Sequence, residues 1–169
     1  LYEVIATNNQ GDPITISPGE FFPSWLSITQ TSRGTAIGAV AGTPNVLGDF
    51  DVQILASDGA HTATQTYVIT VVPVIEFTTD PGTFVLEGEL FTYDAAVSYN
   101  GNDPISIEEG ITFPNWLTIV DNGDNTASIS GSTYETGFHQ VDIVATDGLV
   151  ETSQTFVLTV AATPIFTSN

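Results

Sequence analysis

The chain has 169 residues, of which 41% are hydrophobic, so it can bury apolar cores and is too apolar for a disordered chain. Its charged residues are 20 Asp and Glu and a single Arg, which gives a formal net charge of −19. This charge excludes nucleic-acid binding, because such binding needs a basic surface. The absence of cysteine excludes disulfides, thiolate zinc sites and a cysteine nucleophile, and no run approaches the roughly 20 apolar residues of a membrane span.

Short alternating segments separated by turn residues predict β-strands along the whole chain. In the first half, residues 50–56 and 64–71 alternate clearly and are joined by an Asp-Gly connection, which is typical of a hairpin. The Val-Pro-Val segment at 72–74 is too short and apolar to be a flexible linker, and Pro73 stiffens it. In the second half, the predicted strands are 76–79, 83–86, 89–98, 104–109, 116–120, 126–130, 139–145 and 153–160. The expected fold class is therefore all-β, with antiparallel β-sandwiches.

The second half of the chain repeats the first. Three motifs return: Asp-Pro-Ile at 12–14 and 103–105, Phe-Pro-x-Trp-Leu at 22–26 and 113–117, and Ala-x-Asp-Gly at 56–59 and 145–148. The offset is 91 residues for the first two motifs (103 − 12) and 89 for the third (145 − 56), so one loop changed length. A period near 90 residues is one whole domain. We therefore predict two tandem β-sandwich domains, residues 1–72 and 73–161.

The two halves differ where they start. Tyr2 aligns with Tyr93 (93 − 2 = 91), so the first domain lacks the opening strand or strands that residues 74–86 give the second. Residues 162–169 repeat the start of the second domain, since Phe166 aligns with Phe77 (166 − 77 = 89). Two explanations stay open. Either the piece was cut from a longer array, or the tail of one chain fills the gap in the next and builds a head-to-tail fibre. The residues of such a strand-exchange tail are Pro164, Ile165, Phe166 and Thr167.

Family resemblance rests on the repeated motifs. Gly-Asp-Pro-Ile-Thr-Ile (11–16) returns as Asn-Asp-Pro-Ile-Ser-Ile (102–107), and both copies continue with Pro-x-Trp-Leu and Ala-x-Asp-Gly. This combination resembles the cadherin-like modules of the dystroglycan type and the related immunoglobulin-like repeats of bacterial surface proteins. The resemblance implies two tandem immunoglobulin/cadherin-like sandwich domains with a structural, adhesive or carbohydrate-associated role. The lack of disulfides favours a prokaryotic surface protein.

The resemblance also implies candidate calcium ligands, because calcium-binding members gather carboxylates at one end of a module. Asp58 and Asp147 match the aspartate of the turn. The loop around the Asp-Pro motif contributes Asp12 in the first copy, and Asn100 and Asp103 in the second. Two of the usual loop aspartates are amides or serine in both copies, so we expect weak binding, since calcium takes 6–8 oxygen ligands. Alternatively, these side chains form turns by bonding to the backbone.

Two further groups of residues bear on binding and catalysis. Trp25 and Trp116 are candidates for stacking on a sugar ring, but their place in an apolar segment that enters a strand favours core packing. His61 and His139 do not occupy equivalent positions, and the sequence contains no Gly-x-Ser-x-Gly elbow. We therefore expect no enzyme.

The sequence thus predicts a non-catalytic structural or adhesive segment of an extracellular surface protein or fibre. Its expected partners are neighbouring repeats, copies of itself, or a cell-surface glycan or protein, without nucleic acid and without insertion into a membrane. Calcium is the one cofactor that the sequence admits. The acidic surface suits a salty extracellular fluid. The alternatives from other classes are a filament subunit joined by its tail and a carbohydrate-binding module.

Overall fold

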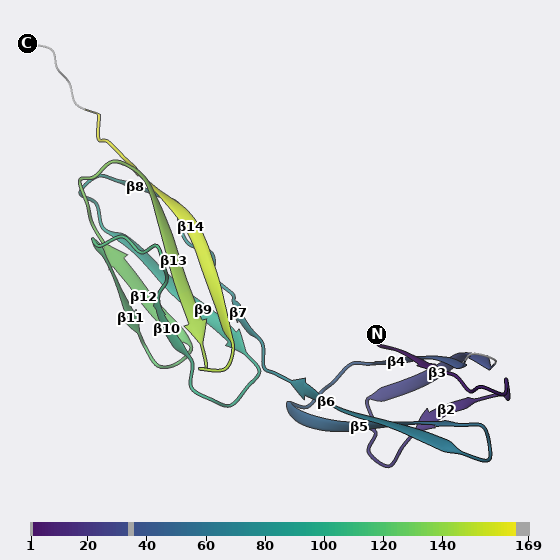
Figure 1. Cartoon of the computed structure of the whole chain (residues 1–169). Coiled ribbons are helices and arrows are strands. Elements are labelled where there is room, and N and C mark those ends of the chain that lie inside the picture. The colour runs from purple at the N-terminus through teal and green to yellow at the C-terminus, as the bar shows by residue number, and fades with distance from the viewer. Residues whose placement is uncertain (1, 34–35, 165–169) are drawn as a thin grey trace, which may run out of the picture. The chain divides into compact units, whose positions relative to one another are not determined.

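The computed structural model describes residues 2–33 and 36–164, and all regular elements of these residues are β-strands (Figure 1). The all-β prediction is therefore confirmed. The chain divides into two compact units, Leu1–Val72 and Pro73–Asn169, called module 1 and module 2 below.

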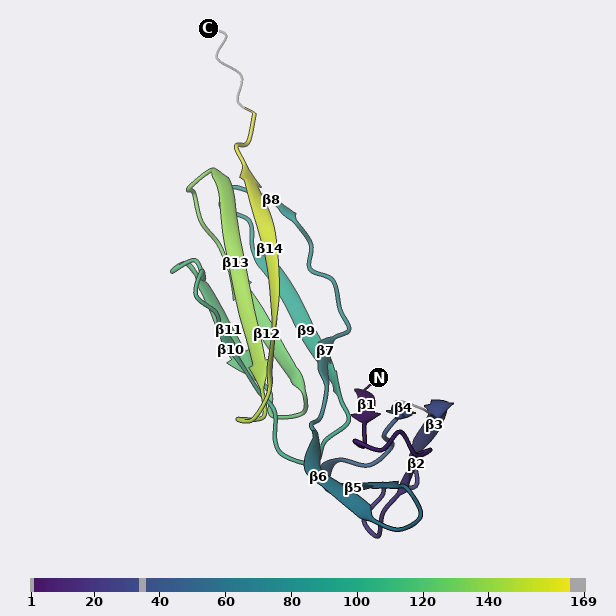
Figure 2. The same ribbon diagram turned by 45° about the vertical axis from the view of Figure 1, so that its right-hand side comes forward.

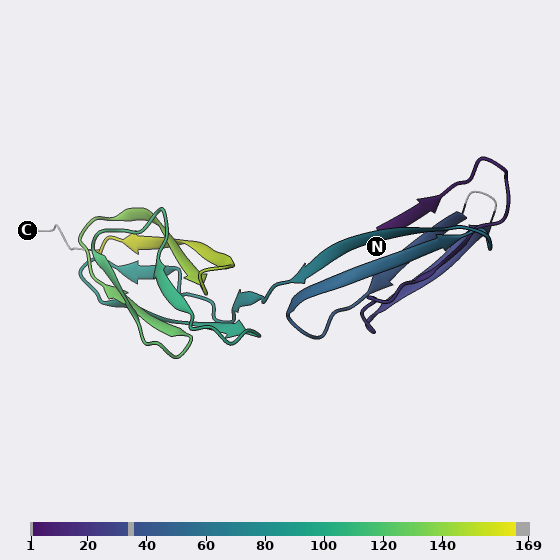
Figure 3. The same ribbon diagram turned by 60° about the horizontal axis from the view of Figure 1, so that its bottom comes forward.

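Module 1 consists of two three-stranded antiparallel sheets (Figure 3). The first sheet has the order β1-β4-β3, with bounds Tyr2–Ala6, Ala36–Gly42 and Leu26–Arg33. The second has the order β2-β5-β6, with bounds Thr15–Pro18, Gly48–Ser57 and Thr62–Val71. Its core residues, which come from both sheets, are Val4, Ile14, Ile16, Ala36, Val40, Val52 and Ile54.

Module 2 has the same plan with one more strand in each sheet (Figure 2). One sheet has the order β11-β12-β9-β7, with bounds Leu117–Asp121, Thr126–Gly131, Phe91–Tyr99 and Ile75–Phe77. The other has the order β10-β13-β14-β8, with bounds Ser106–Glu109, Gly137–Thr146, Glu151–Ala161 and Phe84–Leu86. Every strand pair is antiparallel except β14 with β8, which is parallel.

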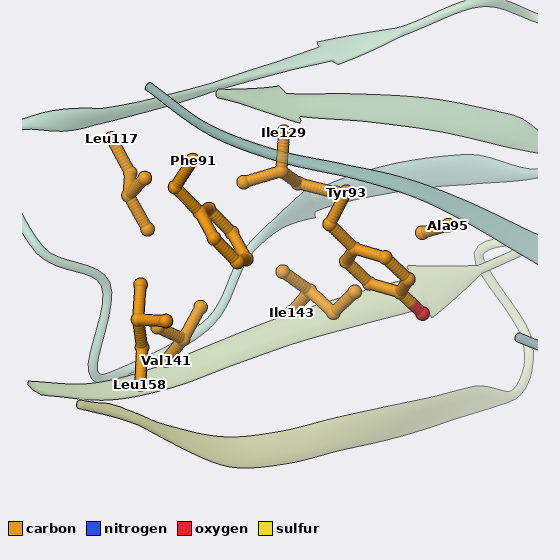
Figure 4. Packing of buried hydrophobic residues seen from close by; sticks show 8 residues of the cluster. All are labelled: Phe91, Tyr93, Ala95, Leu117, Ile129, Val141, Ile143 and Leu158. Atoms are coloured by element: carbon orange, nitrogen blue, oxygen red, sulfur yellow. The ribbon is translucent and has the colours of Figure 1, made fainter. Parts of the chain in front are cut away.

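Alternating side chains explain why these segments form a sandwich. In β9, buried and more exposed residues alternate, and Phe91, Tyr93, Ala95 and Val97 face inward. Figure 4 shows the first three of these side chains directed toward Val141, Ile143 and Leu158 of the other sheet. The strands of module 2 begin and end within two residues of the predicted bounds.

The registers place the two modules in direct correspondence. Tyr2 lies opposite Val40 in module 1, as Tyr93 lies opposite Ile129 in module 2. The strands β1 to β6 therefore correspond to β9, β10, β11, β12, β13 and β14 in that order. Strands β7 and β8, which come from the opening segment of module 2, have no counterpart among the described residues of module 1.

Candidate functional site

Asp147, the strongest calcium candidate, closes the turn between β13 and β14. Its Oδ1 atom accepts the N–H groups of Leu149 at 2.9 Å and Val150 at 2.8 Å, and its Oδ2 atom accepts the hydroxyl of Tyr99 at 2.6 Å. The Tyr99 bond, followed by the two backbone bonds, lowers the pKa of Asp147. The same bond is the largest cause that raises the pKa of Tyr99 to about 12. Asp147 thus joins its turn to the end of β9, a contact that the sequence analysis missed.

Asn100 and Asp103 lie in the loop that follows β9, at the same end of module 2. The Oδ1 atom of Asn100 accepts the N–H of Val74 at 2.7 Å, which fixes the start of the module against this loop. Asp103 is exposed, and its charge is a smaller contribution, after the Asp147 bond, to the raised pKa of Tyr99. The structure therefore brings Asp103 and Asp147 to one phenol, whereas Asn100 bonds to the opening segment.

The candidate ligands of module 1 likewise bond within the module. The Oδ1 atom of Asp58 accepts the N–H groups of Ala60 at 2.9 Å and His61 at 2.7 Å. These bonds, the one from His61 first, lower the pKa of Asp58. The backbone oxygen of Asp12 accepts the side-chain amide of Asn8 at 3.2 Å. Among the described residues, no three or more His, Cys, Asp or Glu side chains form a group that could hold a metal ion. Weak calcium binding stays a prediction, and the observed bonds favour the turn-forming role.

The two tryptophans pack against their own modules. Trp25 and Trp116 are half-buried, and their Nε1 atoms are out of contact with solvent and bond to no described residue. Trp25 meets Phe50 edge-on with ring centroids 5.6 Å apart, and Trp116 meets His139 in the same way at 5.4 Å. Burying an indole N–H without a hydrogen-bond partner costs free energy, which the apolar contacts of the rings must offset. This arrangement favours the core role over sugar stacking.

Module 1 has an open groove of about 580 Å³. It is lined by β1, β6 and the facing ends of β3 and β4, and most of its lining is apolar. Its principal side chains are those of Tyr2, Trp25, Leu26, Gln65, Tyr67 and Ile69. The sequence predicts a gap at this place, because residues 1–72 contain no counterpart of the opening segment of module 2.

In module 2, the corresponding place is occupied by the module's own opening segment. Strand β7 pairs with β9 and strand β8 pairs with β14, so this segment covers one edge of each sheet (Figures 1 and 2). Phe77 and Val85 from these strands pack against the core cluster of module 2. Of the predicted tail residues, Pro164 is exposed; Ile165, Phe166 and Thr167 lie outside the described residues.

The chain is similar to several solved structures. An endo-fucoidan hydrolase of glycoside hydrolase family 107, MfFcnA4, is 21% identical over 96% of this chain, with a TM-score of 0.43. This chain spans only 26% of that hydrolase. A chimeric titin Z1Z2 tandem is 16% identical, with 95% of this chain and 89% of that chain covered and a TM-score of 0.45. Human protocadherin-24 EC1-2 is 14% identical, with 97% and 88% covered and a TM-score of 0.40.

No curated protein matches the chain. The described residues contain no helix long and apolar enough to cross a membrane. The family comparison confirms the predicted resemblance to immunoglobulin-like modules: residues 2–72, which make up module 1, match the family model described as "Putative Ig domain".

Proposed function

We propose that this chain is a non-catalytic structural segment of an extracellular surface protein, in which immunoglobulin-like modules follow one another as a tandem array. The observation that supports this most is what the two modules share. They repeat the strand order and the core, whereas His61 and His139 do not occupy equivalent positions. Tandem arrays of structural domains typically repeat the fold of each domain without repeating a set of catalytic side chains.

Composition supports the same role. Each module has its own apolar core, and the chain has no cysteine, so each module folds without a disulfide. The formal net charge of −19 keeps such an array soluble and separates neighbouring chains at low ionic strength. The natural partners are then the adjoining modules of the same protein, and adhesion to a surface protein or glycan is the secondary possibility.

The experiment that tests this proposal combines unfolding with two activity screens. Each module contains one tryptophan, so a Trp116→Phe variant reports on module 1 and a Trp25→Phe variant reports on module 2. We expect each reporter to show a cooperative urea transition without added ligand. We also expect neutral and sulfated polysaccharides to leave the fluorescence unchanged, and fucoidan to release no reducing ends.

Three outcomes would contradict the structural role. Saturable quenching of one reporter by a polysaccharide would indicate a carbohydrate-binding module. Release of reducing ends by the chain would indicate an enzyme. A module that unfolds without a cooperative transition in the absence of a ligand would not serve as a structural unit.

A further inference from the structure

The outer side of the sheet β10-β13-β14-β8 in module 2 carries exposed apolar side chains. Phe138 of β13, Thr159 of β14 and Phe84 of β8 are register partners, so they form one row across three strands. Phe138 is 81% exposed and Phe84 is 62% exposed. In the neighbouring row, the exposed Val157 lies opposite Gln140. Because register partners lie on the same face of a sheet, these side chains form one patch.

Ile111 extends this patch from the loop between β10 and β11, and it is 98% exposed. Hydrogen bonds to Asp142 of β13 hold this loop. The N–H of Gly110 donates to the carbonyl oxygen of Asp142 at 2.8 Å, and the N–H of Ile111 donates to its Oδ2 atom at 3.1 Å. The N–H of Asp142 in turn donates to the carbonyl oxygen of Thr112 at 2.7 Å. The side chains of the patch, called the apolar face below, are Phe84, Ile111, Phe138 and Val157.

Module 1 builds the same loop and the same rows with acidic residues at three positions. The N–H of Gly19 donates to the carbonyl oxygen of Gln53 at 2.8 Å, and the N–H of Glu20 donates to its Oε1 atom at 2.9 Å. Asp49 lies opposite Thr70 in the row that corresponds to the first row of module 2. The three exposed acids fall on uncharged residues: Glu20 on Ile111 (111 − 20 = 91), Asp49 on Phe138 (138 − 49 = 89) and Asp51 on Gln140 (140 − 51 = 89).

The composition of the two modules does not explain this difference in charge. Module 2 contains 14 of the 20 acidic residues and no Lys or Arg, whereas module 1 contains the other six (20 − 14). Module 1 also exposes Phe21 and Val68 on this side, but they share their hollow with Asp51. The more acidic module thus has the less acidic face. A contiguous exposed apolar patch on a soluble protein is typical of an interaction site.

Carboxylates lie around the apolar face. Glu135 lines a shallow hollow together with Ile111 and Phe138. On β10, the exposed Glu108 lies opposite Val144, which has the same phase along β13 as Phe138. An apolar centre with a polar rim is the usual anatomy of a protein–protein interface. Because this rim is acidic, electrostatic complementarity favours a basic partner.

The charge of the chain argues against a second copy as the occupant. Two chains of formal net charge −19 repel each other. A dimer through this face would also bring two acidic rims together, and juxtaposed like charges are unfavourable at an interface. A basic protein is instead attracted by the whole chain and meets opposite charges at the rim.

We propose that the apolar face of module 2 is a docking surface for a protein whose contact surface has an apolar centre and a basic rim. Phe138 and Ile111 are the apolar anchors of this contact. Glu108 and Glu135 pair with lysine or arginine side chains of the partner. The attraction by the acidic rim speeds association and is screened by salt.

The test uses the full chain and three labelled synthetic peptides, which alternate Phe with Arg, Ser with Arg, or Phe with Glu. In fluorescence anisotropy, we expect the Phe/Arg peptide to bind saturably, with an affinity that falls as salt rises, and the other two to bind at least about tenfold more weakly. Phe138→Thr should weaken binding by about ten- to hundredfold, the value of burying a large apolar side chain. The control is Val120→Thr, which removes an exposed apolar side chain from β11 of the other sheet and should leave binding unchanged.

Two further measurements separate the rim from the centre. Glu135→Gln should weaken binding of the Phe/Arg peptide by about two- to fivefold and reduce its dependence on salt, because single exposed ion pairs are weak. Trp116 lines the hollow beside Phe138, so its fluorescence in the Trp25→Phe variant should respond to the peptide. The fluorescence of Trp25 in the Trp116→Phe variant should not respond. Urea unfolding of module 2 checks that each variant is folded.

Four results would overturn the proposal. Failure of the Phe/Arg peptide to bind at low salt removes the docking surface. Binding that Phe138→Thr leaves unchanged places the contact elsewhere. Equal binding of the Ser/Arg peptide reduces the contact to charge attraction without an apolar centre. Dimers of the chain in sedimentation that Phe138→Thr abolishes would assign the apolar face to a second copy. None of these results affects the cooperative unfolding by which the structural role is tested.

Discussion

Leu26 and Leu117 occupy equivalent positions at the start of β3 and β11, so they form a matched pair for mutation. Leu117 is 4% exposed and belongs to the main core cluster of module 2. Replacing a buried leucine with alanine costs about 2–5 kcal/mol of unfolding free energy, so we expect this range for Leu117→Ala. Leu26 is half-buried beside the groove, and part of its surface already contacts water. Leu26→Ala should therefore cost about 1–2 kcal/mol.

Urea unfolding in the single-tryptophan backgrounds measures the two costs separately. With a slope of about 2 kcal/mol/M, the midpoint of module 2 should fall by roughly 1–2.5 M for Leu117→Ala, and that of module 1 by roughly 0.5–1 M for Leu26→Ala. Equal costs at the two positions would refute the reasoning, because they would mean that the greater burial of Leu117 does not set its contribution to stability.

Three further predictions concern hydrogen bonds, pH and calcium. Tyr93→Phe should destabilise module 2 by about 1–2 kcal/mol, because it removes a hydroxyl that bonds to Thr79 and Gln154. The equivalent variant Tyr2→Phe should change the unfolding free energy of module 1 by less than about 0.5 kcal/mol. Urea unfolding measures both changes. The folded-state pKa of Asp147 is lowered, so its contribution to stability is present above about pH 4 and is lost as the pH falls through the folded-state value. Thermal melts of Asp147→Asn should therefore show a weaker acid dependence in module 2, while module 1 keeps the dependence due to Asp58. Finally, a calcium titration should raise the melting midpoint of module 2 only slightly, and Asp147→Asn should remove this rise. A large rise that survives Asp147→Asn would place the ion elsewhere.

The strands were predictable from sequence because their side chains alternate. Residues 137–146 and 151–161 form one hairpin across an Asp-Gly turn, and both the alternation and the turn are local signals. Strand β8 is different. It has three residues and pairs in parallel with β14, which depends on a crossing from one sheet to the other that no local pattern encodes. The segment 83–86 was identified as a strand, but its partner was not.

Contacts between distant residues explain what the sequence left out of the candidate site. Tyr99 and Asp147 are 48 residues apart, and nothing in either motif pairs a phenol with a turn aspartate. Equivalent positions in the two modules can also carry different residue types that make the same hydrogen bond. Gln30 accepts the N–H of Ile16 at 3.1 Å, and Asp121 accepts the N–H of Ile107 at 3.2 Å. The offset of 91 (121 − 30) would have revealed this pair, although the residue types differ.

The parallel pairing of β8 with β14 has a mechanical consequence. When a module is pulled by its two ends, parallel strands near those ends slide along each other, so their hydrogen bonds carry the load together and must break together. Module 2 contains this arrangement through Phe84–Leu86 against residues 159–161. Among the described strands of module 1, every pair is antiparallel. Module 2 is therefore expected to resist pulling at its two ends, and single-molecule extension would measure its rupture force.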